Sequence, residues 1–459
     1  MKKILSFLIV LLFVMNISCT SSYAKYMYND EYINVKLQRP IKSNNYINLK
    51  SENGFVIFSF DGYLKEMDKL IVNEIVITLG DNDSIAIKDK NDYILYSFGN
   101  NDNIYISSID EFEPIVKVEN DRYRDYLTFI RNGNKIDVIN YVSLNHYLYG
   151  VVPREMPSTF PLEALKAQAI ASRTFALKNI NKHIKEGYNL CDSTDCQVYG
   201  GYDSETEITN RAVDETIGIV LKYNNELIEA SYHSNSGGYT EDSANVWGIS
   251  YPYLKAVEDE FSVGLPNSNW QIILSSSDIR NRLLKNNINI GEIVSLTPTE
   301  ILGNGRVVKL KIVGTNGEII LEKDKIRQVF GYSDIKSNWF DIRKINGNNL
   351  DNSIKEIYAM DSNKTVKIKL SDFYTINGEK AKVFSNREGF KRIVTDKGIE
   401  NINKVQALND SVEFVIEGKG YGHGVGMSQW GAKRMGELGY THDEILKHYY
   451  SGVELTTLY

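Results

Sequence analysis

Residues 161–184 form the segment that most restricts how this chain can fold. Pro161 suits the first position of a helix, because a proline there loses no hydrogen bond. Apolar and small residues then recur at helical spacing on one face, and alanines on another face allow close packing. These residues are Leu162, Leu165, Ala169, Ser172 and Ala176, and Ala164, Ala167 and Ala171. The pattern predicts a long central helix that is buried in the protein.

The sequence on both sides of this helix is typical of β-structure. Residues 54–60, 75–79 and 307–313 are runs of β-branched and aromatic residues, separated by clusters of Asn, Asp and Gly. A helical piece is expected at 277–285, and two more near 427–437 and 443–450. We predict an α+β fold in which β-rich modules surround a discontinuous catalytic core with a long central helix. The predicted parts are an N-terminal module at 25–135, core segments at 136–262 and 413–459, and an inserted β-rich region at 263–412.

The first 24 residues predict export from the cell. Met1-Lys2-Lys3 is a short basic start, residues 4–17 are apolar, and Ser22-Tyr23-Ala24 is a plausible cleavage site. The apolar stretch is short for a membrane span. The predicted location is therefore extracellular or associated with the cell wall, with an uncleaved membrane anchor as the alternative. A net charge of −7 without a long basic run argues against nucleic acid as a partner.

Glu155 is the candidate catalytic residue, because it lies between Pro153 and Pro157 directly ahead of the predicted helix. Prolines fix their own φ and push the preceding residue toward extended geometry, so the carboxyl group can be aimed. Lys166 and Arg173 lie seven residues apart on nearly the same helix face. A general acid needs a raised pKa, so Arg173 is expected to hold substrate rather than to pair with Glu155.

Two glycine-containing segments are candidate binding loops. His233-Ser234-Asn235-Ser236-Gly237-Gly238 offers hydroxyls, an imidazole and open backbone, and it lacks the G-x-S-x-G elbow of many serine hydrolases. Residues 418–432 alternate glycine with other residues and include His423 and Gln429. This alternation indicates backbone that passes close to a ligand or to another backbone. The alternatives are an ordinary polar turn for the first segment and a structural histidine for the second.

The motifs taken together closely resemble the stage II sporulation protein D family. They are residues 148–157, 161–169, 196–199, 233–238 and 422–432, and the resemblance runs from about residue 120 to the end. It implies a peptidoglycan lytic transglycosylase that prefers glycan strands without stem peptides, with Glu155 as the catalytic acid. It also implies a role in sporulation or cell-wall remodelling.

The resemblance further implies a structural zinc site. Family members that bear a metal hold zinc with one histidine and two cysteines, and His183, Cys191 and Cys196 are the matching residues. Many relatives have a histidine just before the second cysteine, where this chain has Asp195. A three-ligand site with water or a fourth group is reasonable for Zn²⁺. A disulfide between Cys191 and Cys196 is the alternative.

The sequence offers one well-framed carboxylate and no obvious second one, which favours a transglycosylase over a two-carboxylate hydrolase. Glu155 would protonate the bridging oxygen and then accept the proton of the C6 hydroxyl. The predicted substrate-binding residues are Lys166, Arg173, His233, Ser234, Ser236, Gly237, His423 and Gln429. The partners expected are peptidoglycan strands and a cell-wall amidase or another wall hydrolase of sporulation. Two rival functions remain: a non-catalytic protein that enhances an amidase, and zinc-dependent amide hydrolysis.

Overall fold

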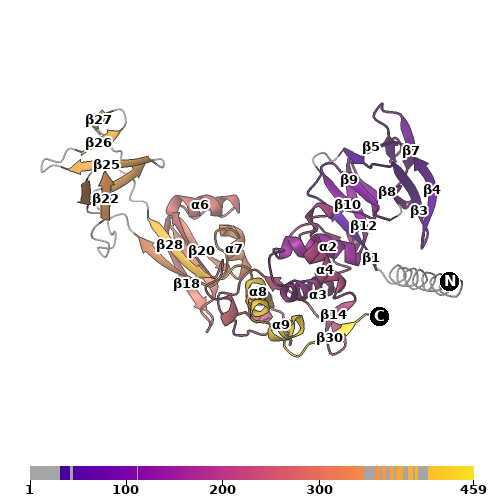
Figure 1. Ribbon diagram of the computed structural model, residues 1–459. Helices are drawn as coiled ribbons and strands as arrows, with labels where there is room; N and C mark the ends of the chain where they lie inside the picture. Colours follow the sequence, from indigo (N-terminus) through magenta and orange to yellow (C-terminus); the bar gives the residue numbers. More distant parts are fainter. Residues whose placement is uncertain are drawn as a thin grey trace, which may run out of the picture.

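The computed structural model describes residues 31–41, 45–110, 112–345 and 412–458, together with six strands between residues 357 and 401. The predicted signal peptide lies outside these residues. The protein has the predicted α+β fold. Figure 1 shows the helices α2, α3, α8 and α9 between the N-terminal strands and the strands of the inserted region. Within the described part of the chain, no helix is both long and apolar enough to cross a membrane.

The N-terminal module, residues 32–143, consists of two antiparallel sheets. Strands β1, β12, β11, β8, β3 and β4 form one sheet, and β10, β9, β2, β5, β6 and β7 form the other. Alternate residues of both sheets enter one buried cluster, as the two-residue period of a strand requires. The strands are β1 (Tyr32–Leu37), β2 (Tyr46–Lys50), β3 (Phe55–Phe60), β4 (Leu64–Leu70), β5 (Glu74–Leu79), β6 (Ile85–Lys88), β7 (Ile94–Phe98), β8 (Ile104–Ser108), β9 (Ile115–Val118), β10 (Asp121–Arg124), β11 (Tyr126–Asn132) and β12 (Lys135–Ser143).

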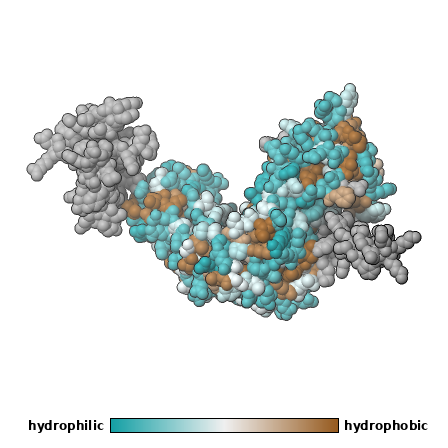
Figure 2. All heavy atoms as spheres, viewed as in Figure 1, coloured by the Kyte–Doolittle hydropathy of each residue, from teal (hydrophilic) through white to brown (hydrophobic). Residues whose placement is uncertain are grey.

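This module is joined closely to the rest of the protein. Its first sheet continues through β12, beyond the boundary expected at residue 135, and gains a parallel edge strand, β13 (Leu190–Cys191), beside β1. Arg124 forms ion pairs with Glu205 at 2.6 Å and with Glu113 at 3.0 Å. Figure 2 shows separate apolar patches on the visible face of the module, and its exposed residues include Tyr63 and Ile71.

The helical core is built around α3, which is buried on most of its surface, as predicted. Its alanines let α2, α4, α8 and α9 pack closely against it. The helix ends at Lys178, earlier than the sequence predicts. The side-chain amide of Asn179 caps this end by donating to the Phe175 carbonyl at 3.0 Å. The helices are α2 (Leu144–Glu155), α3 (Leu162–Lys178), α4 (Glu207–Asp214), α5 (Ser243–Trp247), α8 (Gln429–Glu437) and α9 (His442–Tyr449).

Short strands close the core by joining distant parts of the chain. Strand β14 (Ile219–Tyr223) pairs with β15 (Glu226–Leu227) and with the C-terminal β30 (Glu454–Thr457). Strand β16 (Tyr232–His233) runs parallel to β29 (Met427–Ser428). Two strand pairings therefore join the two parts of the discontinuous core.

The inserted region has its own hydrophobic cluster, separate from that of the core. In one of its sheets β28 lies between β17 and β21, so residues 413–419 belong to this sheet and lead from it into the glycine-rich segment. Its elements are β17 (Asn269–Ser275), α6 (Ser276–Lys285), β18 (Ile293–Ile301), β19 (Val307–Gly314), β20 (Gly317–Glu322), α7 (Asp324–Phe330), β21 (Phe340–Ile345), β22 (Ile357–Asp361), β23 (Lys364–Ile368), β24 (Phe373–Ile376), β25 (Glu379–Ser385), β26 (Lys391–Thr395), β27 (Gly398–Asn401) and β28 (Glu413–Lys419).

Candidate active site

Glu155 is the last residue of helix α2, and Pro153 lies inside that helix. The expectation of extended backbone before each proline is therefore wrong for Val152, which precedes Pro153 and lies within the helix. It is right for Met156, which precedes Pro157 and has φ −127° and ψ 132°. The chain thus leaves the helix sharply just after Glu155, and the carboxyl group is placed at a helix end.

The carboxyl group of Glu155 is held by several hydrogen bonds. The backbone N–H of Val198 donates to Oε1 at 3.0 Å. The side chains of Tyr232 and Gln429 also bond to this carboxyl group. Burial raises the pKa of Glu155, and these hydrogen bonds together with the Arg154 charge lower it in part. The net shift is upward, which is the direction that a general acid requires.

A cleft of about 690 Å³ opens beside Glu155. His423, Tyr232 and Trp247 line it together with Glu155, and so does a second acid, Glu229. Glu229 has a raised pKa because of its burial, and Asn179 Nδ2 donates to Oε1 at 3.3 Å. No sequence pattern pointed to this second carboxyl group, since a glutamate near a short strand usually faces solvent.

Of the eight predicted substrate-binding residues, His423 alone lines the cleft, and two of the other seven have structural roles in the helical core. Arg173 is only 1% exposed and donates to the carbonyls of Thr216, Ile219 and Val213 at 2.7, 3.1 and 3.3 Å. Lys166 forms ion pairs with Glu163 at 2.9 Å and Glu215 at 2.6 Å. Lys166 and Arg173 lie on one face of α3, as their spacing predicts, but this face packs against α4 and the turn after it. Neither residue enters the function proposed below.

The His-Ser-Asn-Ser-Gly-Gly loop and the glycine-rich segment pack directly against each other. His233 pairs with Ser428 in the β16–β29 ladder, and its Nδ1 lies 3.1 Å from the Val425 carbonyl oxygen. A Cβ on Gly422 would lie 2.6 Å from Cβ of His233, and one on Gly237 would lie 2.8 Å from the Gly420 nitrogen. The glycines therefore allow two backbones to approach, which is one of the two predicted roles.

The serines of this loop differ in their surroundings. Ser236 is buried, donates to Asp259 Oδ2 at 2.6 Å, and lies 2.8 Å from Ser262 Oγ. Ser234 is partly exposed, and its carbonyl accepts the N–H of Trp430 at 3.0 Å. Gly237 lines a neighbouring cavity rather than the Glu155 cleft. Buried Asp259, which also accepts from the Tyr449 hydroxyl at 2.9 Å, was not singled out from the sequence.

His423 and Gln429 are the two residues of the third motif that lie at the site. The ring of His423 lines the cleft, and its Nδ1 accepts the N–H of Val425 at 3.0 Å. Burial lowers the pKa of His423 to about 4, so its ring is neutral at neutral pH. Gln429 Nε2 donates to Gln168 Oε1 at 3.3 Å, and its side chain also bonds to Glu155. Gln429 thus contacts the acid itself.

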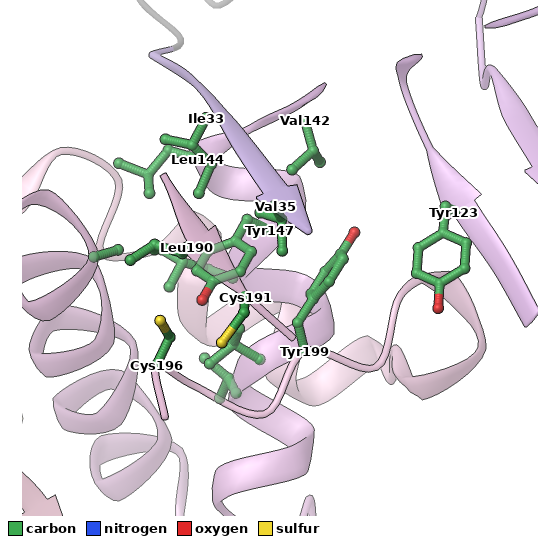
Figure 3. Packing of buried hydrophobic residues seen from close by; sticks show 14 of the residues in the cluster. Ile33, Val35, Tyr123, Val142, Leu144, Tyr147, Leu190, Cys191, Cys196 and Tyr199 are labelled. Atoms are coloured by element: carbon green, nitrogen blue, oxygen red, sulfur yellow. The ribbon is translucent and has the colours of Figure 1, made fainter. Parts of the chain in front are cut away.

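The residues predicted for zinc come together with one more. Ligand atoms of His183, Cys191, Asp195 and Cys196 all lie within 4.8 Å of one another. His183 Nε2 lies 3.1 Å from Asp195 Oδ2, so the residue that departs from the relatives is part of the cluster. Both cysteines are free thiols, and the disulfide alternative is not present. Figure 3 shows the side chains of Cys191 and Cys196 in the buried cluster, close to Leu190 and Tyr147.

This donor set fits a structural zinc ion. A histidine, two thiols and a carboxylate supply four ligands, the number that a closed tetrahedral site uses. A hydrogen bond from Cys196 lowers the pKa of Cys191 to about 5, which favours the thiolate that binds metal. The cluster also lies on the loop that supplies Val198 to Glu155, so an ion there would fix the position of that amide.

Comparison with known proteins gives two matches to protein families. Residues 132–223 match the family described as stage II sporulation protein, and residues 267–360 match a domain of unknown function, DUF8618. Glu155, Val198 and the four candidate zinc ligands all lie in the first match, and the second match lies entirely in the inserted region.

The chain is also similar to three curated bacterial proteins. It is 34% identical over 310 residues to the amidase enhancer of Bacillus subtilis (strain 168), covering 68% of this chain and 40% of that protein. It is 27% identical over 333 residues to stage II sporulation protein D of the same organism, covering 69% of this chain and 75% of that protein. It is 28% identical over 333 residues to stage II sporulation protein D of Bacillus amyloliquefaciens, covering 69% and 74%. These matches confirm the resemblance predicted from the motifs.

Proposed function

We propose that this chain acts on the cell wall, as a peptidoglycan lytic transglycosylase with Glu155 as its catalytic acid. The match of residues 132–223 to the stage II sporulation protein family and the similarity to the two Bacillus subtilis proteins support this role. The observation that supports this most directly is the setting of Glu155. Its pKa is raised by burial, its carboxyl group is oriented by Val198, and it faces a cleft. The substrate lies outside the cytoplasmic membrane, so the proposal includes export of the protein.

The proposed reaction needs one carboxyl group that acts twice. Protonated Glu155 gives its proton to the oxygen between MurNAc C1 and GlcNAc C4, and the C1–O bond breaks to leave GlcNAc with a hydroxyl. The Glu155 carboxylate then takes the proton of the MurNAc C6 hydroxyl as that oxygen bonds to C1. The products are a 1,6-anhydro end and a new GlcNAc end, and no water is consumed. Orientation of the C6 hydroxyl replaces an external nucleophile.

The other residues of the site support this step. Val198, Tyr232 and Gln429 hold the carboxyl group, so that it points in one direction throughout the reaction. Neutral His423 lines the cleft and offers a polar ring without a competing charge. A zinc ion would be held by His183, Cys191, Asp195 and Cys196, and it would brace the Val198 loop without entering the chemistry.

The experiment that tests the proposal is product analysis by mass spectrometry on peptide-free glycan strands. The wild-type protein is expected to give 1,6-anhydro ends, and Glu155→Gln is expected to give none. Glu207→Gln, on the exposed first turn of α4, is the matched control and should cleave normally. Because Glu229 shares the cleft, the digestion is run in ¹⁸O-labelled water. Labelled reducing ends in place of anhydro ends would contradict transglycosylation and indicate a two-carboxylate hydrolase.

Similarity to an amidase enhancer supports a second candidate function, in which the protein binds glycan and stimulates a peptidoglycan amidase without cutting. Release of stem peptides by a purified amidase is measured on intact cell wall, with wild-type protein or with Glu155→Gln. Equal stimulation by both, with no anhydro ends in either digest, would favour this second function. Loss of stimulation in Glu155→Gln would indicate that stimulation of the amidase depends on cleavage of the glycan.

A further inference from the structure

Trp247 presents a large aromatic side chain to solvent in the cleft of Glu155. It is 39% exposed, and Ile249, which also lines the cleft, is 55% exposed. Water contact with so much apolar surface is unfavourable, and a partly exposed indole at the wall of a cleft is typical of a binding site. Neither residue takes part in the proposed chemistry.

The segment that carries Trp247 is fixed at several points. Asp242 caps helix α5 by accepting the N–H of Ala244 at 2.8 Å, and Gly248 ends the helix with φ +78°. The hydroxyl of Ser243 accepts the N–H of Tyr251 at 3.0 Å. These contacts hold the segment as a closed loop, so Trp247 stays exposed without collapsing onto the core.

The indole ring is also braced inside the cleft. Its centroid lies 5.3 Å from that of the His423 ring, at an angle of 55° between the planes. The tilt leaves much of the indole uncovered, in agreement with its exposure. His423 therefore limits the rotation of Trp247 while the ring remains available to a ligand.

A pyranose ring matches these surroundings. Its axial C–H groups form an apolar face, and its hydroxyl and acetamido groups lie around the edge. The cleft offers the Trp247 ring for such a face, and Asn179 and Glu229 offer hydrogen bonds for polar edges. We propose that Trp247 is the residue on which one sugar of the glycan strand stacks, beside the bond presented to Glu155. This inference rests on glycan being the ligand of the proposed function, and it extends to either catalytic or non-catalytic binding.

The test measures binding in Glu155→Gln, so that no cleavage interferes. Peptide-free glycan oligosaccharides are titrated into the protein, and indole fluorescence and heat of binding are recorded. The chain has four tryptophans, and Trp270 is buried in the inserted region. A blue shift on binding is expected, and it should disappear in Trp247→Phe because the reporting indole is gone. Phe keeps a flat face and should bind within about three-fold of the parent.

Trp247→Leu keeps apolar bulk but loses the flat face, and it should bind at least about ten-fold more weakly. Ile273→Ala removes an equally exposed apolar side chain from β17, outside the cleft, and is the matched control, with a change under about three-fold. Far-ultraviolet circular dichroism and melting temperature must match the parent in every variant. If Trp247→Leu fails this check, Trp247→Met takes its place.

The results separate this inference from the proposed function. Trp247-dependent binding by a wild-type protein that does not cleave would support the inference and contradict the transglycosylase. Binding that is equal in Trp247→Leu and the parent would overturn the inference whether or not the protein cleaves. An equal loss of glycan affinity in Trp247→Phe and Trp247→Leu would overturn the inference as well, and so would the absence of glycan binding by the parent.

Discussion

The backbone N–H of Val198 donates to Oε1 of Glu155 at 3.0 Å, and Val198 lies two residues after Cys196. The amide that orients the candidate catalytic acid is therefore supplied by the loop of the candidate zinc ligands. Strand β13, which contains Cys191, also pairs with β1 of the N-terminal module. The module, the metal cluster and the acid are thus connected through one short stretch of backbone.

The raised pKa of Glu155 predicts a pH-dependent effect of Glu155→Gln on stability. A group whose pKa is higher in the folded state stabilises the fold below its unfolded pKa, and that contribution is lost as pH rises through the folded value. Glutamine resembles the neutral acid. The melting temperature of Glu155→Gln should therefore exceed that of the wild type at pH 8, and the gap should narrow near pH 4. A difference in melting temperature between Glu155→Gln and the wild type that stays constant with pH would contradict the prediction.

Removal of the Gln429 hydrogen bond should change the pH profile of cleavage. Gln429 bonds to the carboxyl group and lowers the pKa of Glu155 in opposition to burial. Gln429→Met removes the bond, so the pKa should rise further and the basic limb of kcat/KM should move to higher pH. Glycan cleavage measured across pH checks this. A basic limb that stays in place, with an unchanged melting temperature, would show that Gln429 does not act on the acid.

The metal cluster should bind one zinc ion per chain, as measured by mass spectrometry of the purified protein. Cys191→Ser should lose the ion, and Asp195→Ala should weaken binding about ten-fold or more in competition with a chelator. Asp195→His should retain zinc, because imidazole is as suitable a ligand as carboxylate. Thiol titration of the denatured protein should find both cysteines reduced. A protein without zinc whose cysteines are oxidised would support the disulfide instead.

Arg306 should be important for stability although it belongs to the inserted region. Its buried guanidinium lies 3.4 Å from Glu241 and donates to the carbonyls of Ser236 and Tyr239 at 3.0 and 2.9 Å. Arg306→Met leaves Glu241 buried without its charge partner and should cost about 3–5 kcal/mol in the free energy of unfolding. Arg343→Ala removes an exposed pair with Glu417 and should cost under about 1 kcal/mol. Urea denaturation compares the two, and similar costs would contradict the prediction.

Substitution of Gly422 should disturb the contact between the His233 loop and the glycine-rich segment. Alanine there would place Cβ 2.6 Å from that of His233, at φ +117°. We expect Gly422→Ala to lower the free energy of unfolding by more than about 2 kcal/mol. Gly439 has φ +92° with open space around it, so Gly439→Ala shows the cost of strain alone, about 1–2 kcal/mol. Denaturation curves measure both changes in the free energy of unfolding. Equal changes would contradict the prediction, because they would mean that His233 moves aside without a cost in stability.

Local patterns in the sequence were enough to find the main helix, the strands and the acid. The period of α3 and the alternation of the strands are repeated over many residues, so each could be recognised without knowledge of its neighbours. The family resemblance carried by the five motifs likewise singled out Glu155 and three of the four candidate metal ligands. The sequence could not show that Arg173 faces backbone carbonyls, because helical spacing gives the face of a residue but not what packs against it.

The sequence by itself determined which chemical groups this protein has and which local elements they lie on. The tertiary structure alone decided which groups meet. Pairing of β16 with β29 joins segments almost 200 residues apart, and burial at that junction sets the direction in which the pKa values of Glu155 and His423 move. Glu229, Asp259 and Trp247 gained their positions in the same way. Contacts between distant segments depend on the packing of the whole core, and no local pattern records them.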